Sequence, residues 1–113
     1  MRPDDATLLD IHIAVGLAMR FVEGYDRAAF FDDPKTQAAV LHELMVIGGA
    51  VKRLSQEFRL AHPEFPWHQI AGMRDKLIHA YDAVDVDQVW RTLKTDLPSL
   101  QSFLKSKLKE QEG

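Results

Sequence analysis

The chain has 113 residues, which suits one domain with a modest hydrophobic core and is too short for two. Apolar residues make up 46% and charged residues 27%, as in ordinary globular proteins, and the absence of cysteine excludes disulfides and thiolate metal sites. The net charge of −3 argues against nonspecific nucleic-acid binding, so any RNA contact requires a local basic patch.

The first predicted element is a helix over residues 4–24, which begins with two aspartates, as helix N-termini favour. Two apolar rows run along it and together form a broad face. A face this wide predicts contact on two sides, as in a helical bundle that also forms a homodimer. The first row is Leu8, Ile11, Val15, Ala18 and Val22, and the second is Leu9, Ile13, Leu17 and Phe21.

The second predicted helix begins at Pro34, with Asp33 as its N-cap, and follows a heptad-like apolar row to Phe58. Gly48 and Gly49 lie inside it, where each glycine costs about 1 kcal/mol relative to alanine. We therefore expect close backbone packing at this pair. The apolar row is Val40, Leu44, Ile47, Val51, Leu54 and Phe58.

Two further helices are predicted after the prolines of HPEFPW, which end the second one. The third runs from Trp67 to Val84. The fourth begins near Asp85, with Gln88 as its capping-box partner, and Pro98 is expected to kink or divide it. Its inner face consists of Val89, Leu93, Leu97, Leu100 and Leu104.

These patterns predict an all-α fold, with a single domain over residues 1–113 that forms an antiparallel bundle of four to five helices. The charged tail, about residues 109–113, is expected to fray. The N-terminus carries early acids and the chain has no apolar run of about 18 residues. We therefore expect neither a signal peptide nor a transmembrane helix, and a cytoplasmic location.

The third helix contains the stretch RDKLIHAYDAV, whose polar residues do not follow the period of a buried face. At about 100° per residue, Arg74 and Tyr81 fall at one border of the core stripe, while His79 falls on the opposite side with Asp75 and Asp82. This position disfavours a buried core histidine. Spacing leaves three interpretations open: a solvated face with a His79–Asp75 pair, a metal site of Asp75, His79 and Asp82, or a catalytic site.

The catalytic interpretation suits RNA cleavage without a metal ion or cofactor. A histidine can accept or donate a proton near neutral pH, and an arginine stays cationic beside phosphate. When the 2′-hydroxyl of RNA attacks the neighbouring phosphorus, His79 would handle protons and Arg74 would stabilise the developing anion. Because the two side chains point apart on a straight helix, we expect either a distortion near His79 or a homodimer that joins two motifs in one cleft.

The pattern R-x4-H-x-Y, flanked in order by IGGAVKRLSQEF, FPWHQIAGM and VDVDQVWRTLKTDLPSL, resembles the HepT family of toxins in the all-helical HEPN ribonuclease superfamily. The resemblance covers residues 5–108. It implies a homodimeric, metal-independent endoribonuclease with Arg74 and His79 as its catalytic pair and transfer RNA as its expected substrate. It also implies a type VII toxin–antitoxin pair, in which an MntA-like minimal nucleotidyltransferase silences the toxin by adenylylating Tyr81.

This chain departs from the family pattern at two places. Gly49 stands where members often have an acid, in an IGEA segment, and Asp82 and Ala83 stand where an aromatic residue and a glycine are common. The first departure bears on activity if the acid orients the arginine. A noncatalytic helical module that docks onto a nucleotidyltransferase and regulates it is therefore the alternative function.

Other residues carry weaker signals. Lys52, Arg53 and Arg59 could form the local basic patch that contacts RNA, or could cover apolar surface with their aliphatic stems as a solvated flank. Trp67 and Trp90 are predicted to be core residues. The remaining histidines lack metal-ligand spacing and are predicted to lie at the surface: His12, His42, His62 and His68.

Overall fold

The computed structural model describes residues 3–79 and 84–112, and every regular element in these ranges is helical. This confirms the predicted all-α fold. None of the helices in the described part is long and apolar enough to cross a membrane. The elements are α1 (Pro3–Phe21), α2 (Arg27–Phe31), α3 (Pro34–Arg53), α4 (Gln56–Ala61), α5 (Trp67–His79), α6 (Val86–Arg91), the π-helical turn η2 (Thr92–Asp96) and α7 (Leu97–Glu112).

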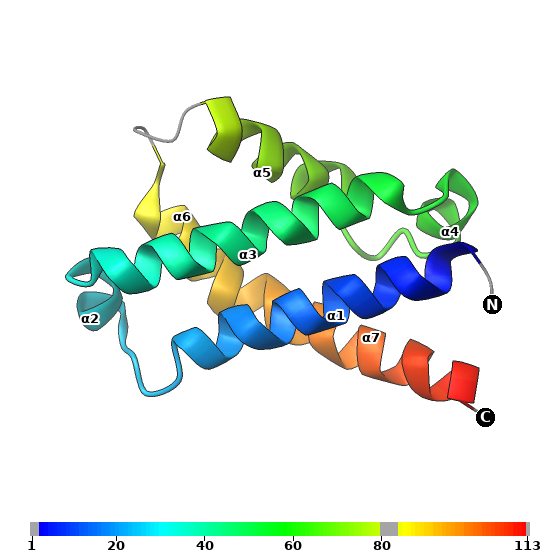
Figure 1. Cartoon of the computed structure of the whole chain (residues 1–113), viewed down its shortest axis with the longest axis horizontal. Helices are drawn as coiled ribbons and strands as arrows, with labels where there is room; N and C mark the ends of the chain where they lie inside the picture. The colour runs from blue at the N-terminus through cyan, green and yellow to red at the C-terminus, as the bar shows by residue number, and fades with distance from the viewer. Residues whose placement is uncertain (1–2, 80–83, 113) are drawn as a thin grey trace.

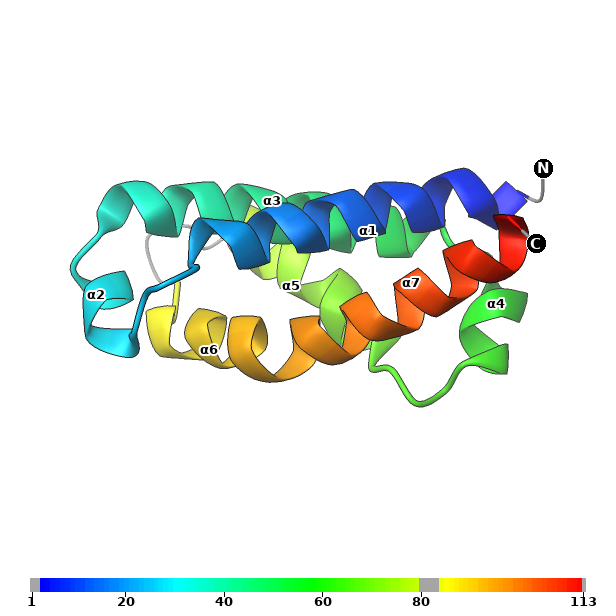
Figure 2. The same cartoon turned by 90° about the horizontal axis from the view of Figure 1, so that it is seen from below.

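The long helices form two layers around one core. α1 and α3 run antiparallel side by side, and the continuous run α6–η2–α7 crosses on the other side of the core (Figures 1 and 2). α1 packs against both α3 and α7, and α5 packs against α3. The predicted first row of α1 and the predicted inner face of the fourth helix are buried throughout, so both predictions are confirmed.

The predicted starts of two helices are confirmed by their caps. Asp33 caps α3: one carboxylate oxygen accepts the Thr36 backbone N–H at 3.1 Å, and the other accepts the hydroxyls of Tyr25 at 2.6 Å and Thr36 at 2.7 Å. These hydrogen bonds stabilise the charged carboxylate and lower the pKa of Asp33 from 3.8 to about 2, and the hydrogen bond from Tyr25 has the largest effect. At α6, the Asp85 carboxylate accepts the backbone N–H groups of Asp87 and Gln88.

The predicted second helix is divided, which corrects its boundary. α3 ends at Arg53, and Ser55 caps the separate helix α4 by accepting the Phe58 N–H at 3.1 Å. Asp4 at the start of α1 accepts both the backbone N–H of Ser55, at 2.9 Å, and its hydroxyl, at 2.7 Å. This long-range cap fixes the corner, and the local apolar period does not reveal it.

Three other boundaries also differ from the predictions. α1 ends at Phe21, and Gly24 adopts a φ of 78° in the following turn, a conformation that glycine tolerates. The short helix α2 was not predicted, although Asp26 caps it by accepting the Ala29 N–H at 2.8 Å. Val84 lies outside any helix, so the predicted end of the third helix there is wrong.

The predicted fourth helix changes its helical type just before Pro98, where a kink or division was expected. Directly before it, the Leu97 N–H donates to the carbonyl of Thr92, five residues back, in the π-helical turn η2. The ring of a proline clashes with the carbonyl four residues earlier, and its backbone nitrogen has no N–H to donate to that carbonyl. The wider π-helical turn accommodates Pro98 without ending the run. The run therefore bends around the core while its apolar face remains buried.

Candidate catalytic site

Arg74 lies on the side of α5 that packs against α3, directly over Gly48 and Gly49. A β-carbon at residue 48 would stand 2.6 Å from the Arg74 β-carbon and 3.1 Å from the carbonyl oxygen of Ile70. Since real β-carbons essentially never approach other atoms so closely, only glycine fits here. The predicted close backbone packing at the glycine pair is confirmed, and it fixes the stem of Arg74.

The rest of the Arg74 side chain passes over Gly49 towards solvent. A β-carbon at residue 49 would stand 3.3 Å from Arg74 Nε and 3.4 Å from Cδ. The Arg74 side chain is 38% exposed, so its guanidinium can reach a ligand at the surface. The arrangement therefore combines a fixed stem with an accessible charged group.

Charged neighbours surround this guanidinium. Lys52 Nζ donates to Asp75 Oδ1, and the same oxygen lies 3.9 Å from Arg74 Nη1. Arg53 Nη2 lies 3.6 Å from Asp10 Oδ2 on α1. All these side chains are substantially exposed, so each pair adds at most about 1 kcal/mol of stability. Their main consequence is the orientation of the two arginines.

The predicted catalytic partner of Arg74 is described only in part. His79 is the last residue of α5, five positions after Arg74 and hence about 140° further around the helix. Its side chain lies outside the described residues, as do Tyr81, Asp82 and Ala83. α5 remains α-helical from Trp67 to His79, so the predicted distortion of the helix backbone before His79 is not seen.

The three predicted RNA-contacting residues occupy different surroundings. Lys52 and Arg53 lie in the last turn of α3, near Arg74. Lys52 donates a hydrogen bond to Asp75, the neighbour of Arg74, and Arg53 and Arg74 both approach Gly49. Arg59 lies on α4, past the corner at Ser55, and its Nε is buried without a hydrogen-bond partner in the described structure. The structure thus gathers Lys52 and Arg53 at the candidate site and places Arg59 on another element.

The metal interpretation gains no support from the described side chains. Among them, no group of three or more histidine, cysteine, aspartate or glutamate residues is placed to hold an ion. Asp75 already accepts a hydrogen bond from Lys52 and faces Arg74, which makes its surroundings cationic. The two other predicted ligands are the His79 side chain and Asp82, which lie outside the described residues.

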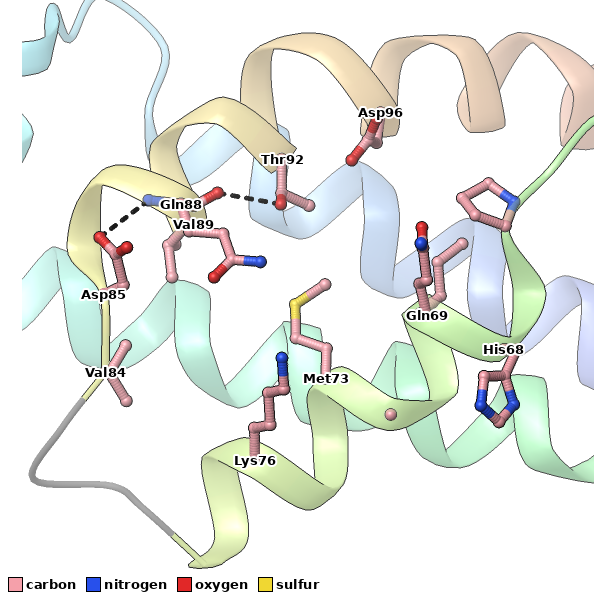
Figure 3. A pocket seen from close by; sticks show the side chains of 13 residues that line it. His68, Gln69, Met73, Lys76, Val84, Asp85, Gln88, Val89, Thr92 and Asp96 are labelled. Carbon is pink, nitrogen blue, oxygen red and sulfur yellow. Dashed lines mark hydrogen bonds between the residues drawn. The ribbon is translucent and has the colours of Figure 1, made fainter.

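A cavity of about 600 Å³ opens on a different side of α5. Figure 3 shows Met73 and Lys76 of α5 pointing across it towards Gln88 and Thr92 of the α6–η2 run. Arg74 does not line the cavity. Sequence reasoning did not identify it, although Gln69, Met73 and Lys76 share one helical face at spacings of four and three residues.

The aromatic predictions are largely confirmed. Trp67 is 5% exposed and donates its indole N–H to the carbonyl of His62 at 2.8 Å, while Trp90 is partly buried and packs 5.3 Å from the Phe30 ring. The surface prediction holds for the exposed His42 and His68. It is wrong for His62, whose ring packs between Phe58 and Phe103 at centroid distances of 4.6 and 4.9 Å. It is also inaccurate for His12, whose Nδ1 is buried.

Comparisons with known proteins identify the family of this chain. The model of the family described as Ribonuclease HepT-like matches residues 11–106. A "Probable ribonuclease HepT" of Thermococcus cleftensis is 47% identical over 94 residues, which is 83% of this chain and 86% of that protein. A "Putative RNase" of Caldanaerobacter subterraneus is 41% identical over 91 residues, or 80% and 81% of the two chains. No solved structure gives a significant match.

The fold and the matched span define a helical ribonuclease class. This chain belongs to the Ribonuclease HepT-like family. The family resemblance inferred from the motif is thereby confirmed, and so is the class of enzyme that it implies. A further relative, a "Putative RNase" of Methanocaldococcus jannaschii, is 35% identical over 108 residues, covering 96% of this chain and 89% of its own length.

Proposed function

We propose that this chain, as one helical domain over residues 1–113, is a toxin that cleaves RNA without a metal ion, with Arg74 and His79 as catalytic residues. The position of Arg74 carries the proposal. Gly48 fixes its stem, its guanidinium reaches solvent, and it lies on the helix whose last residue is His79. Membership of a ribonuclease family supports the same reaction.

In the proposed reaction, the 2′-oxygen of one nucleotide bonds to the adjacent phosphorus, and the bond from phosphorus to the 5′-oxygen of the next nucleotide breaks. A neutral His79 accepts the proton of the 2′-hydroxyl, and a protonated His79 of a second copy donates one to the leaving 5′-oxygen. Arg74 stabilises the charge on the phosphoryl oxygens through charge-assisted hydrogen bonds. The products are a 2′,3′-cyclic phosphate and a 5′-hydroxyl.

A homodimer is part of the proposal because the positions of Arg74 and His79 on α5 are separated by about 140° around the helix axis. The predicted second row of α1 supports such an assembly, since Leu9, Ile13 and Phe21 expose between 36% and 52% of their surface. Sedimentation of the Ile13→Glu variant provides a test. We expect it to be monomeric and inactive, while Leu60→Glu, at an apolar residue on α4 that is 71% exposed, leaves the dimer intact.

We further propose transfer RNA as the substrate and an MntA-like nucleotidyltransferase antitoxin as the partner that adenylylates Tyr81. The family resemblance supports both. Tyr81 follows His79 by two residues, so an adenylyl group there would add bulk and a negative charge close to the RNA phosphate. Repulsion between the two phosphates would prevent substrate binding.

The decisive experiment replaces His79 by alanine and measures cleavage of purified transfer RNA in the presence of a chelator. We expect wild-type activity to survive the chelator and the His79→Ala variant to lose about 10²- to 10⁴-fold, the range for general acid–base groups. The control is His68→Ala, an exposed histidine on the same helix, which should retain full activity. Full activity in His79→Ala would contradict the catalytic assignment.

Coexpression with a neighbouring nucleotidyltransferase separates this function from the noncatalytic alternative. If the proposal is correct, intact mass rises by whole adenylyl units, the modification maps to Tyr81, and only the unmodified protein cleaves RNA. Absence of both cleavage and added mass would favour the docking module, and Gly49 would be the first residue to re-examine.

A further inference from the structure

The side chains of Arg74 and Arg53 both approach Gly49. The point where its β-carbon would stand lies 3.3 Å from Arg74 Nε and 4.0 Å from Arg53 Nη1. Among the described residues, and apart from the immediate helix backbone and chain neighbours, no other heavy atom is closer to that point than these arginine side chains. Two cations from different helices therefore border the same small space.

Each arginine also has a carboxylate near a nitrogen other than the one that approaches Gly49. Arg53 Nη2 lies 3.6 Å from the Asp10 carboxylate, while Nη1 of the same guanidinium lies near Gly49. Arg74 Nη1 lies 3.9 Å from the Asp75 carboxylate, while Nε of the same side chain lies near Gly49. The Arg53 and Arg74 side chains are 58% and 38% exposed, so solvent and ligands can reach them. Both outer carboxylates thus hold the guanidinium groups without occupying the space between them.

We infer that Arg53 and Arg74 together bind one phosphate of the RNA backbone in the space over Gly49. This inference rests on the proposed RNA substrate and makes Arg53 a substrate-binding residue beside Arg74. A guanidinium presents planar N–H donors that match phosphate oxygens, and two guanidinium groups that repel each other in the free protein gain most from a shared anion. Lys52 differs from Arg53 because Asp75 already holds its ammonium group.

If this inference is correct, the glycine at residue 49 is needed for phosphate to reach Arg53 and Arg74. An acidic side chain at this position would enter the space between Arg53 and Arg74 and neutralise both arginines. With glycine, the same space remains available to a phosphate. The departure from the family pattern is then a change in how the site binds its substrate, while the position of Arg74 is preserved by Gly48.

The test measures binding of a fully 2′-O-methylated RNA oligonucleotide, which has no free 2′-hydroxyl and cannot be cleaved. Fluorescence anisotropy should show about 10-fold weaker binding by Arg53→Ala, as expected for lost hydrogen bonds to a charged group. The slope of log Kd against the logarithm of the salt concentration should also fall by about 0.7, because one phosphate contact is lost. The matched control is Arg91→Ala, because Arg91 is 67% exposed and lies 3.8 Å from Asp87, much as Arg53 lies from Asp10.

These results separate the inference from the proposed function. If the wild-type protein cleaves RNA but Arg53→Ala and Arg91→Ala bind equally well with equal salt slopes, the phosphate site is wrong and the nuclease stands. If the wild-type protein cleaves no RNA but Arg53→Ala alone weakens binding, the phosphate site stands and the proposed function fails.

A second pair of variants tests the space itself. Gly49→Glu and Gly49→Gln add side chains of nearly equal size, and circular dichroism checks that both fold. We expect both to weaken binding, and the glutamate to weaken it several-fold more because its charge competes with the phosphate. Equal affinities for the two variants, or wild-type affinity in Gly49→Glu, would overturn the inference.

Discussion

The two sides of α5 differ sharply in packing. Towards α3, a β-carbon at Gly48 would overlap the stem of Arg74. Towards α6 and η2, a β-carbon at Gly72 would have no neighbour within 4 Å among the described residues, and the surface opens into the cavity of about 600 Å³. One helix thus has a side that is closely fitted to its neighbour and a side that is not.

This difference shows where the molecule can hold a catalytic group. A side chain that stabilises a transition state must be positioned to within about 0.5 Å, which requires a packed support. Gly48 provides that support for Arg74, whereas Lys76 extends over the open cavity. The tightly packed side of α5 is therefore the side to which we assign the stabilisation of phosphate charge by Arg74.

The largest expected effect compares two cations on these opposite sides. We expect Arg74→Ala to lower kcat/KM for RNA cleavage about 10²- to 10³-fold, the range for removing one group that stabilises transition-state charge. Lys76→Ala removes an equal charge two residues away and should change cleavage less than about threefold, since exposed charges act mainly through screened long-range attraction. Single-turnover cleavage at saturating enzyme measures both variants. Equal losses would show that the cavity side also takes part in the reaction.

A smaller effect is expected from Gly48→Ala. The added methyl group meets the Arg74 β-carbon at 2.6 Å and a backbone oxygen at 3.1 Å, so α3 and α5 must separate. Overpacking costs about 1–3 kcal/mol, and the better helix propensity of alanine returns at most about 1 kcal/mol. Urea denaturation should therefore show a net loss of stability, and cleavage should fall because Arg74 moves. A stable, fully active Gly48→Ala variant would show that the contact does not position Arg74.

Sequence predicted the elements of this comparison but not their distances. The apolar rows of α1, α3 and α7 repeat with the period of a helix. This period can be read from residues of the same helix, so the buried residues were predictable. The glycine pair was also informative, because its helix-propensity cost required compensation. Its partner could not be named, since the contact with Arg74 joins two helices.

The parts that sequence missed depend on contacts between distant segments. At the break, Ser55 donates two hydrogen bonds to Asp4, which is 51 residues earlier in the chain, and Arg53 lies 3.6 Å from Asp10 on α1. Neither pair has a local spacing signal. His62 was misjudged for the same reason, because its burial depends on Phe103 in α7. The sequence thus indicated candidate residue types for the site but could not give the contacts that place Arg53 and Arg74.

The smallest expected effect tests the open side of α5. Gly72 lies in the helix interior, and no atom of the described part of the chain is within 4 Å of its β-carbon position, so Gly72→Ala should raise the free energy of unfolding by up to about 1 kcal/mol through helix propensity alone. Cleavage should remain unchanged because Arg74 faces α3. Gly16→Ala in α1, where a β-carbon also has no neighbour within 4 Å, gives the reference gain for an open helical site. A loss of stability at Gly72 with a gain at Gly16 would mean that something packs into the cavity in solution, and the contrast between the two sides of α5 would then disappear.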